Sequence, residues 1–404
     1  MFLDIDKVMS KYRINKYWVI NHDMKIYNHS FIDNTMEVGT NYKILNSLFF
    51  IYDNLVGKIE FDNISYNALN CLISNYIKNV EMYCESSLLP SEPDIEISSQ
   101  EDSDDFDLMV DIVSKEIELY TEKNQNIIIE ETYIQDKITF YFNYNSYILY
   151  NKQSYLNLCL KDFGFRNIVC NKKPYCGILH EVIENEKLKP IADNESILLE
   201  NKVIKLSHNV FAFIVKLLLQ LLDGEQIIRN NSLLSKQDFG KQILRREITI
   251  KNFVDNNGFC FDSEGFQMKN KVLINNGILI DCINNIKSGS ELKCKSGNSF
   301  YDYFLDYCVN KPNKILFEYK ENKKPYPEIF AYLFDIKDTR VIIDGDTGYI
   351  RLNLLGKGND GQIMNYHIYR NIFDLINGIV GVSGEQQEHD ECIVQEVIID
   401  LGGD

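Results

Sequence analysis

Several features that would indicate a particular chemistry are missing from this sequence of 404 residues. Ten cysteines are present, but no two of them form a Cys-x-x-Cys pair, which argues against a zinc ribbon or a thioredoxin-like redox motif. No Gly-x-Ser-x-Gly segment is present, which argues against the nucleophile elbow of a serine hydrolase. The glycines of residues 356–361 precede no strong helical pattern, so they do not form a typical phosphate-binding loop.

Histidine is scarce, and its spacing supports no metal site on a helix. No two of the six histidines lie at i and i+4, and neighbouring ones are at least seven positions apart: His22, His29, His180, His208, His367 and His389. His180-Glu181 looks like half of a zincin motif, but the next histidine is His208. An ordinary imidazole is therefore the better interpretation of His180.

Positive charge is also in short supply. The chain has 42 Lys and Arg against 59 Asp and Glu, which gives a formal net charge of −17. Such a surface repels phosphate backbones and anionic lipid heads, so we expect neither nucleic acid nor a membrane as a partner. The most apolar run, residues 210–222, is interrupted by Lys216 and Gln220, and is too short to span a bilayer.

The remaining composition is that of a globular protein of the cytoplasm. Apolar residues make up 45% and charged residues 25%. Residues 1–10 hold two acidic side chains and no apolar stretch, so we expect no signal peptide. The scattered cysteines are typical of reduced, partly buried thiols. A chain of this length exceeds one ordinary core, and we expect two domains, 1–195 and 196–404, with a boundary near residues 191–200.

The first domain has the pattern of a mixed α/β domain. Residues 18–61 contain β-rich runs separated by turns, and residues 65–80 change to helical spacing. Residues 90–107 are crowded with Asp, Glu and Ser, which predicts a solvated, mobile acidic excursion. We expect a helix over residues 108–120 and one or two strands over residues 127–150.

The second domain begins with an apolar helix over residues 209–223, which Gly224 is expected to end at its C′ position. Short β-like runs then dominate, at residues 248–250, 272–274, 278–280, 315–317, 340–343 and 349–355. Asn276-Gly277 is a hairpin signal, and Asp262-Ser263-Glu264-Gly265 predicts a turn in which Gly265 takes a positive φ. The expected fold class is therefore α+β, with a largely antiparallel barrel or sandwich-like C-terminal domain.

The order and spacing of several blocks resemble the C-terminal domain of the TldD/PmbA family. The blocks are Gly240-Lys241-Gln242-Ile243, Phe261-Asp262-Ser263-Glu264-Gly265, Asn275-Asn276-Gly277-Ile278-Leu279, Ser296-Gly297-Asn298, Asp346-Thr347-Gly348, residues 371–376 and residues 397–402. The N-terminal part agrees more faintly, through residues 55–59 and the helix that follows them.

The resemblance locates a metal motif that this chain lacks. In TldD-type members a helix carries His-Glu-x-x-x-His, in which two imidazoles bind the metal and the Glu activates water. Alignment on Gly224 places the three functional positions at Val215, Lys216 and Gln220. Val215 has no donor atom, Lys216 has the wrong charge beside a cation, and Gln220 is a poor zinc ligand. We therefore expect no catalytic residue and no metal in this chain.

The resemblance implies a TldE/PmbA-type, non-catalytic subunit. Such a pseudoenzyme forms a heterodimer with a TldD-like catalytic subunit, which is expected to hold zinc, and the metallopeptidase complex cleaves unfolded or leader peptides. Peptide maturation of a ribosomally made, modified product is a typical role for such pairs. Exposed strand edges are expected to bind the peptide by β-addition.

Two alternatives remain open from the sequence. One is a stand-alone peptide-binding or regulatory module without peptidase activity, in line with the family's older label as a modulator of DNA gyrase. The other is an enzyme with a different constellation, such as Cys with His, although no spacing supports it.

Overall fold

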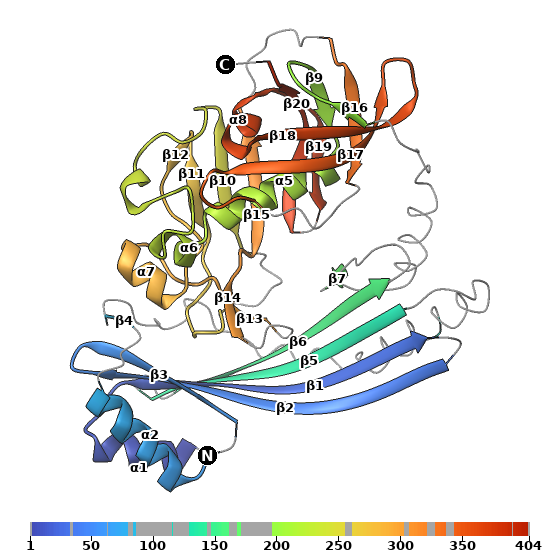
Figure 1. Cartoon of the computed structure of the whole chain (residues 1–404). Helices are drawn as coiled ribbons and strands as arrows, with labels where there is room; N and C mark the ends of the chain where they lie inside the picture. The colour runs from blue at the N-terminus through green and yellow to red at the C-terminus, as the bar shows by residue number, and fades with distance from the viewer. Residues whose placement is uncertain are drawn as a thin grey trace. The chain divides into compact units, whose positions relative to one another are not determined.

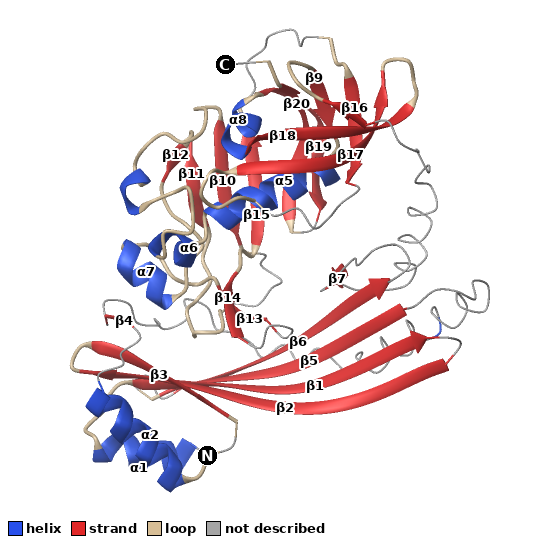
Figure 2. Ribbon diagram, in the orientation of Figure 1, coloured by secondary structure: helices blue, strands red, loops and turns tan. Residues whose placement is uncertain are grey.

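The structure is a computed structural model that describes residues 2–32, 35–62, 64–79, 84–85, 115, 129–143, 147–160, 168–170, 196–254, 261–302, 307–320, 328–336, 343–389 and 391–402. The chain divides into two compact units, one of residues 1–86 and 92–190 and the other of residues 87–91 and 191–404. Strands are the prevailing element of both units (Figure 2). The acidic segment 90–107 and most of the expected helix 108–120 lie outside the described residues.

The first unit is built on a seven-stranded antiparallel sheet with the order β4-β3-β2-β1-β5-β6-β7 (Figure 1). Its strands are β1 (Tyr17–Ile32), β2 (Thr35–Tyr52), β3 (Leu55–Phe61), β4 (Cys84–Glu85), β5 (Ile129–Phe142), β6 (Tyr147–Leu160) and β7 (Ile168–Cys170). The β-rich runs of residues 18–61 and 127–150 are thus confirmed as strands.

Two helices cover one face of this sheet, α1 (Phe2–Lys11) and α2 (Tyr66–Asn79). The buried side chains of α2, Leu69 and Ile73, lie one turn apart and join a cluster with Val19 and Phe50 of the sheet. The helical spacing of residues 65–80 is therefore confirmed as an amphipathic helix that packs on a sheet.

The second unit contains an 11-stranded sheet with the order β12-β11-β10-β15-β20-β9-β16-β17-β18-β8, in which β19 also pairs with β20. Its strands are β8 (Ser196–Leu198), β9 (Val203–Leu206), β10 (Ile248–Phe253), β11 (Lys271–Asn275), β12 (Ile278–Leu279), β15 (Lys314–Tyr319), β16 (Ala331–Ile336), β17 (Tyr349–Gly358), β18 (Ile363–Asn371), β19 (Ile379–His389) and β20 (Cys392–Asp400).

Most neighbours in this sheet are antiparallel, whereas β15 with β20, β9 with β16, and β8 with β18 are parallel. A separate two-stranded hairpin consists of β13 (Ser299–Asp302) and β14 (Tyr307–Asn310). Among the described strands the large sheet stays open, with β12 and β8 at its two ends. The α+β class and the sandwich-like form are therefore confirmed, while a closed barrel is not formed. The expected strand 340–343 lies outside the described residues except for Ile343.

Four α-helices among the described residues accompany this sheet: α5 (His208–Leu221), α6 (Gly224–Ile228), α7 (Ile286–Leu292) and α8 (Ile372–Asn377). Helix α5 packs against β16, β19 and β20 and crosses the sheet (Figure 1). Its buried side chains belong to the large core of this unit, which includes Ile204, Ile250, Leu333 and Ile399. No helix among the described residues is long and apolar enough to cross a membrane.

The turns expected from glycine are confirmed at two places. Asn276 and Gly277 have φ of 47° and 79° and join β11 to β12, as a tight hairpin requires. Gly265 has φ of 84° in the turn that follows Asp262. Both positions need backbone conformations that glycine adopts without steric cost.

The role expected for Gly224 is wrong. Helix α5 ends at Leu221 and is capped by Leu222, and Gly224 is instead the first residue of α6, after the N-cap Asp223. Glycine is needed there for space, because a Cβ atom would lie 2.0 Å from Oδ1 of Asn284. The sequence showed the glycine but not the loop that packs against it.

Candidate functional site

The three positions of the aligned metal motif all lie on α5, which is a core helix. Nine of its 14 residues are buried, and Ser207 caps its start by accepting a hydrogen bond from the Val210 amide. Val215 is fully buried, Lys216 is half-buried and Gln220 is exposed. Five residues turn an α-helix by about 140° from one face to another. Val215 therefore packs in the core while Gln220 faces outward.

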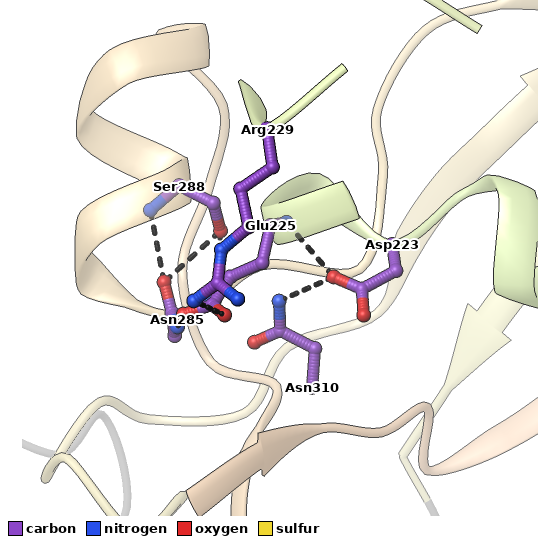
Figure 3. Close-up of polar contacts among 6 residues, drawn as sticks. All are labelled: Asp223, Glu225, Arg229, Asn285, Ser288 and Asn310. Carbon is purple, nitrogen blue, oxygen red and sulfur yellow. Dashed lines mark hydrogen bonds and ion pairs between the residues drawn. The ribbon is translucent and has the colours of Figure 1, made fainter. Parts of the chain in front are cut away.

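A polar corner follows the end of α5 (Figure 3). Oδ1 of Asp223 accepts a hydrogen bond from the Glu225 amide at 2.8 Å and another from Nδ2 of Asn310 at 2.7 Å. Burial raises the pKa of Asp223, and the hydrogen bond from Asn310 opposes that rise. The carboxylate thus fixes the start of α6 and ties it to β14.

The same corner links α6 to α7. Glu225 forms an ion pair with Arg229 at 3.0 Å and accepts a hydrogen bond from Nδ2 of Asn285 at 2.5 Å. Asn285 is the N-cap of α7, where its Oδ1 accepts from the amide of Ser288 at 2.8 Å. Asp223 and Asn285 each accept a hydrogen bond from a backbone amide that a helix start leaves unsatisfied, and Glu225 ties α6 to α7 through Asn285.

Two carboxyl groups are fully buried in the turn that precedes β11. The two oxygens of Asp262 accept hydrogen bonds from the amides of Glu264, Phe266 and Ser299, at 3.0, 2.8 and 3.1 Å. Oε2 of Glu264 accepts from the amide of Ile286, the first residue of α7, at 2.6 Å. Burial and the neighbouring Glu264 raise the pKa of Asp262 to about 8. The block interpreted as a simple turn therefore holds buried acids that organise three segments.

A buried lysine completes this polar region. Nζ of Lys271, on β11, donates hydrogen bonds to Oδ1 of Asn298 at 2.6 Å and to the carbonyl oxygen of Lys295 at 2.5 Å. Burial lowers the pKa of Lys271, and the negative charges of Asp281 and Asp262 oppose that fall. The Ser296-Gly297-Asn298 block thus anchors a charged side chain of the sheet.

One group among the described residues has the donor set of a metal site. The ligand atoms of Asp281, Cys282 and Cys294 lie within 4.8 Å of one another. Asp281 and Cys282 belong to the loop between β12 and α7, and Cys294 follows α7. None of the three was singled out from the sequence, because two cysteines 12 positions apart match no common ligand spacing.

Two histidines also meet in space without any signal in their spacing. The rings of His208, at the start of α5, and His389, at the end of β19, are stacked with centroids 5.8 Å apart. A ring nitrogen of His208 lies 3.0 Å from the carbonyl oxygen of Glu385. His180, the half-motif histidine, lies outside the described residues.

A separate open pocket of about 460 Å³ lies on β8, β17 and β18. It is lined by Leu198, Arg351, His367, Ile368 and Tyr369. None of the aligned metal-motif residues lines this pocket.

Comparison with known proteins gives a family and a fold. The model of the PmbA/TldA metallopeptidase C-terminal domain matches residues 202–400. No curated protein matches the sequence. Among solved structures, TldE from Thermococcus kodakarensis is similar over 98% of both chains, with a TM-score of 0.69 and 15% identity.

Two further structures are similar to this chain, and both are described as candidate modulators of DNA gyrase. The one from Thermotoga maritima MSB8 has a TM-score of 0.68 and 14% identity over 99% of this chain and 98% of that one. The one from Bacteroides thetaiotaomicron VPI-5482 has a TM-score of 0.68 and 12% identity over 99% and 96%. At identities this low, the structural similarity shows a shared fold and nothing more.

Proposed function

The chain belongs to the PmbA/TldD family of metallopeptidase-type proteins, and from this premise we propose that it is a non-catalytic, TldE-type subunit of a peptidase complex. The proposal rests on the side chains that stand at the metal-motif positions of α5. The positions that align with the family's metal motif are Val215, Lys216 and Gln220, and Val215 is part of the core. A metal ligand at that place would have to displace a packed side chain.

In this proposal the work is divided between two chains. A TldD-type partner holds zinc, a water molecule and the general base, since zinc activates bound water for attack on a carbonyl carbon. This chain contributes the interface and one wall of the chamber in which the peptide lies. The similarity to a solved TldE supports the assignment to this type of subunit.

The proposed substrate class is an unfolded or leader peptide, and maturation of a ribosomally made, modified peptide in the cytoplasm fits that class. An extended peptide can add to a sheet edge by main-chain hydrogen bonds, which makes recognition largely independent of sequence. The net charge of −17 favours a neutral or basic peptide over an acidic one. The same charge disfavours direct binding of DNA.

The experiment is co-expression of this chain with a TldD-type chain encoded in the same source, followed by sizing and a cleavage assay on an unfolded peptide. We expect a one-to-one complex that cleaves, while this chain alone, with zinc added, leaves the peptide intact. Cleavage by the lone chain would overturn the non-catalytic assignment. If this chain binds the peptide but forms no complex with the TldD-type chain, the result favours the stand-alone binding module.

A further inference from the structure

The loop before α7 and the residue just after its end converge on one point in the second unit. Asp281 and Cys282 are buried in that loop, and Cys294 lies half-buried beyond the C-cap Lys293. The carboxylate oxygen and the two sulfur atoms lie within 4.8 Å of one another. Two thiols and one carboxylate at this separation are a donor set that zinc accepts in proteins.

We propose that Asp281, Cys282 and Cys294 bind one zinc ion that fastens the two ends of α7, at a place separate from the aligned motif on α5. Binding displaces the two thiol protons to solvent, and the sulfur atoms become thiolate ligands. Water occupies the fourth position of the tetrahedron. Zinc–sulfur bonds of about 2.3 Å place two tetrahedral sulfur ligands about 3.8 Å apart, so a separation of up to 4.8 Å closes with a small side-chain movement.

The surroundings of the three ligands orient them for this role. Oδ1 of Asp281 accepts hydrogen bonds from the Cys282 amide at 2.7 Å and from Nδ2 of Asn284 at 3.3 Å. The same Nδ2 donates to the carbonyl oxygen of Cys282 at 3.1 Å. Asn284 is fully buried, so it holds the carboxylate and the backbone of the neighbouring ligand in place. Such supporting hydrogen bonds are what tune a metal site and fix its ligand orientation.

The charge of the site also balances around zinc. A zinc ion with two thiolates and one carboxylate carries one net negative charge. Lys271 is buried close enough to interact electrostatically with Asp281, Cys282 and Cys294, and its ammonium group neutralises that charge. A buried charged centre is tolerated when its charge is paired and hydrogen-bonded, as Lys271 is through Asn298.

We expect the zinc ion to hold α7 in place from both of its ends. This helix has seven residues, which is too few to be stable without support at its ends. Its N-cap Asn285 donates to Glu225 of α6, which directly follows α5. Zinc would therefore stabilise the whole α6–α7 corner. The inference does not depend on the proposed partnership with a TldD-type chain.

The test uses the full chain, purified with its thiols reduced and stripped of metal with a chelator. Co²⁺ is titrated first, because thiolate ligation gives it a sulfur-to-metal charge-transfer band, and Zn²⁺ is then used to displace it. We expect one metal per chain in the unaltered protein, and loss of the band in Cys282→Ser and in Cys294→Ser. Cys71→Ser is the matched control, since Cys71 is exposed on α2 in the other unit and should leave binding unchanged.

Two measurements keep the test decisive if a cysteine variant fails to fold. Asp281→Asn keeps the side-chain shape, and we expect it to fold and to bind zinc at least about 10-fold more weakly. Zinc should also raise the unfolding temperature of the unaltered chain, because a ligand bound only to the folded state stabilises it. The proposal is overturned if the reduced, unaltered chain binds no metal, if the metal remains in both cysteine variants, or if the two thiols only form a disulfide on oxidation.

Discussion

Helix α5 and the segment that follows it, residues 223–310, fill buried space in opposite ways. On α5 every buried side chain is apolar, and these side chains belong to one large core. The segment after it buries a set of polar and charged groups, namely Asp262, Glu264, Lys271, Asn284, Asn285, Ser288 and Asn298. Two stretches that are neighbours in sequence and in space thus follow different physical rules.

The difference separates an apolar helix from a region in which buried polar groups are held in a defined geometry. A packed apolar helix tolerates exchange among apolar residues of similar volume, but it offers nothing to a metal. The seven buried polar groups named above each have a hydrogen-bond partner, and removing one partner leaves the other unsatisfied. We therefore expect large effects from polar groups placed into α5, and graded effects from single hydrogen bonds removed beyond it.

The largest effect is expected from restoring the family motif on α5. The triple variant Val215→His, Lys216→Glu, Gln220→His should lose about 2–4 kcal/mol of unfolding free energy, because the imidazole at position 215 enters an apolar core without a partner. The lone variant chain should still not cleave peptides, with or without zinc. Urea unfolding and a peptide assay measure the two effects.

The single variant Gln220→His is the control for that experiment, since Gln220 is exposed on the same helix. Its free energy of unfolding should stay within about 0.5 kcal/mol of the original. A triple variant as stable as this control would show that α5 is not the tightly packed helix described above.

Gly224→Ala should have the next largest effect, a loss of about 1–3 kcal/mol, because the added Cβ would lie 2.0 Å from Oδ1 of Asn284. Thermal and urea unfolding measure it. Gly39→Ala is a matched control, because no atom lies within 4 Å of the Cβ position on that exposed strand residue. Equal effects of the two substitutions would contradict the close approach at α6.

Asp262→Asn tests the buried carboxyl groups through the pH dependence of stability. The pKa of Asp262 is raised to about 8 in the folded state, whereas it is about 3.9 in the unfolded state. Between these two pH values the folded state therefore binds one more proton than the unfolded state. The contribution of Asp262 to stability is therefore full below about pH 4 and declines as the pH rises toward 8. Asp262→Asn removes the titrating group, so the unfolding free energy of the variant should fall less over this pH range.

The same substitution also has a cost that does not depend on pH. The carboxyl oxygens accept three backbone hydrogen bonds, and an amide nitrogen cannot accept one, so about 1–3 kcal/mol should be lost near pH 5. The difference in unfolding free energy between the variant and the original chain should become smaller as the pH approaches 8. A stability curve parallel to the original over this range would contradict the raised pKa.

The smallest effect is expected at the corner of Asp223. Asn310→Ala removes the 2.7 Å hydrogen bond to Oδ1 of Asp223, while the Glu225 amide still donates to that oxygen. We expect a loss of about 0.5–1.5 kcal/mol in unfolding free energy. A double-mutant cycle with Asp223→Asn measures the coupling, and zero coupling would show that the two side chains are independent.

Much of this fold follows from local patterns in the sequence. The β-rich runs predicted the strands of residues 18–61 and, after residue 247, β10, β11, β12, β15 and β17, and helical spacing predicted α2 and α5. Asn276-Gly277 predicted its hairpin because the tight turn requires two positive φ angles. These elements depend on interactions between residues that are close in the chain.

The parts that the sequence did not predict depend on distant residues. The sequence pattern places Gly224 at a helix end, but glycine is needed there because Asn284, 60 positions further on, leaves no space for a Cβ atom. Asp262 and Glu264 have the composition of an exposed turn, and only the amides of Ser299 and Ile286 explain their burial. The same is true of Asp281, Cys282 and Cys294, which meet only because α7 turns the chain back.

The measurement that tests the central claim most directly is peptide cleavage by three samples at equal concentration: this chain, a TldD-type chain from the same source, and the co-expressed pair. The account predicts that this chain is inert with zinc added, and that the pair forms a one-to-one complex that cleaves. It also predicts that substituting the metal-binding motif of the TldD-type chain abolishes that cleavage. Zinc-dependent cleavage by this chain alone would contradict the account.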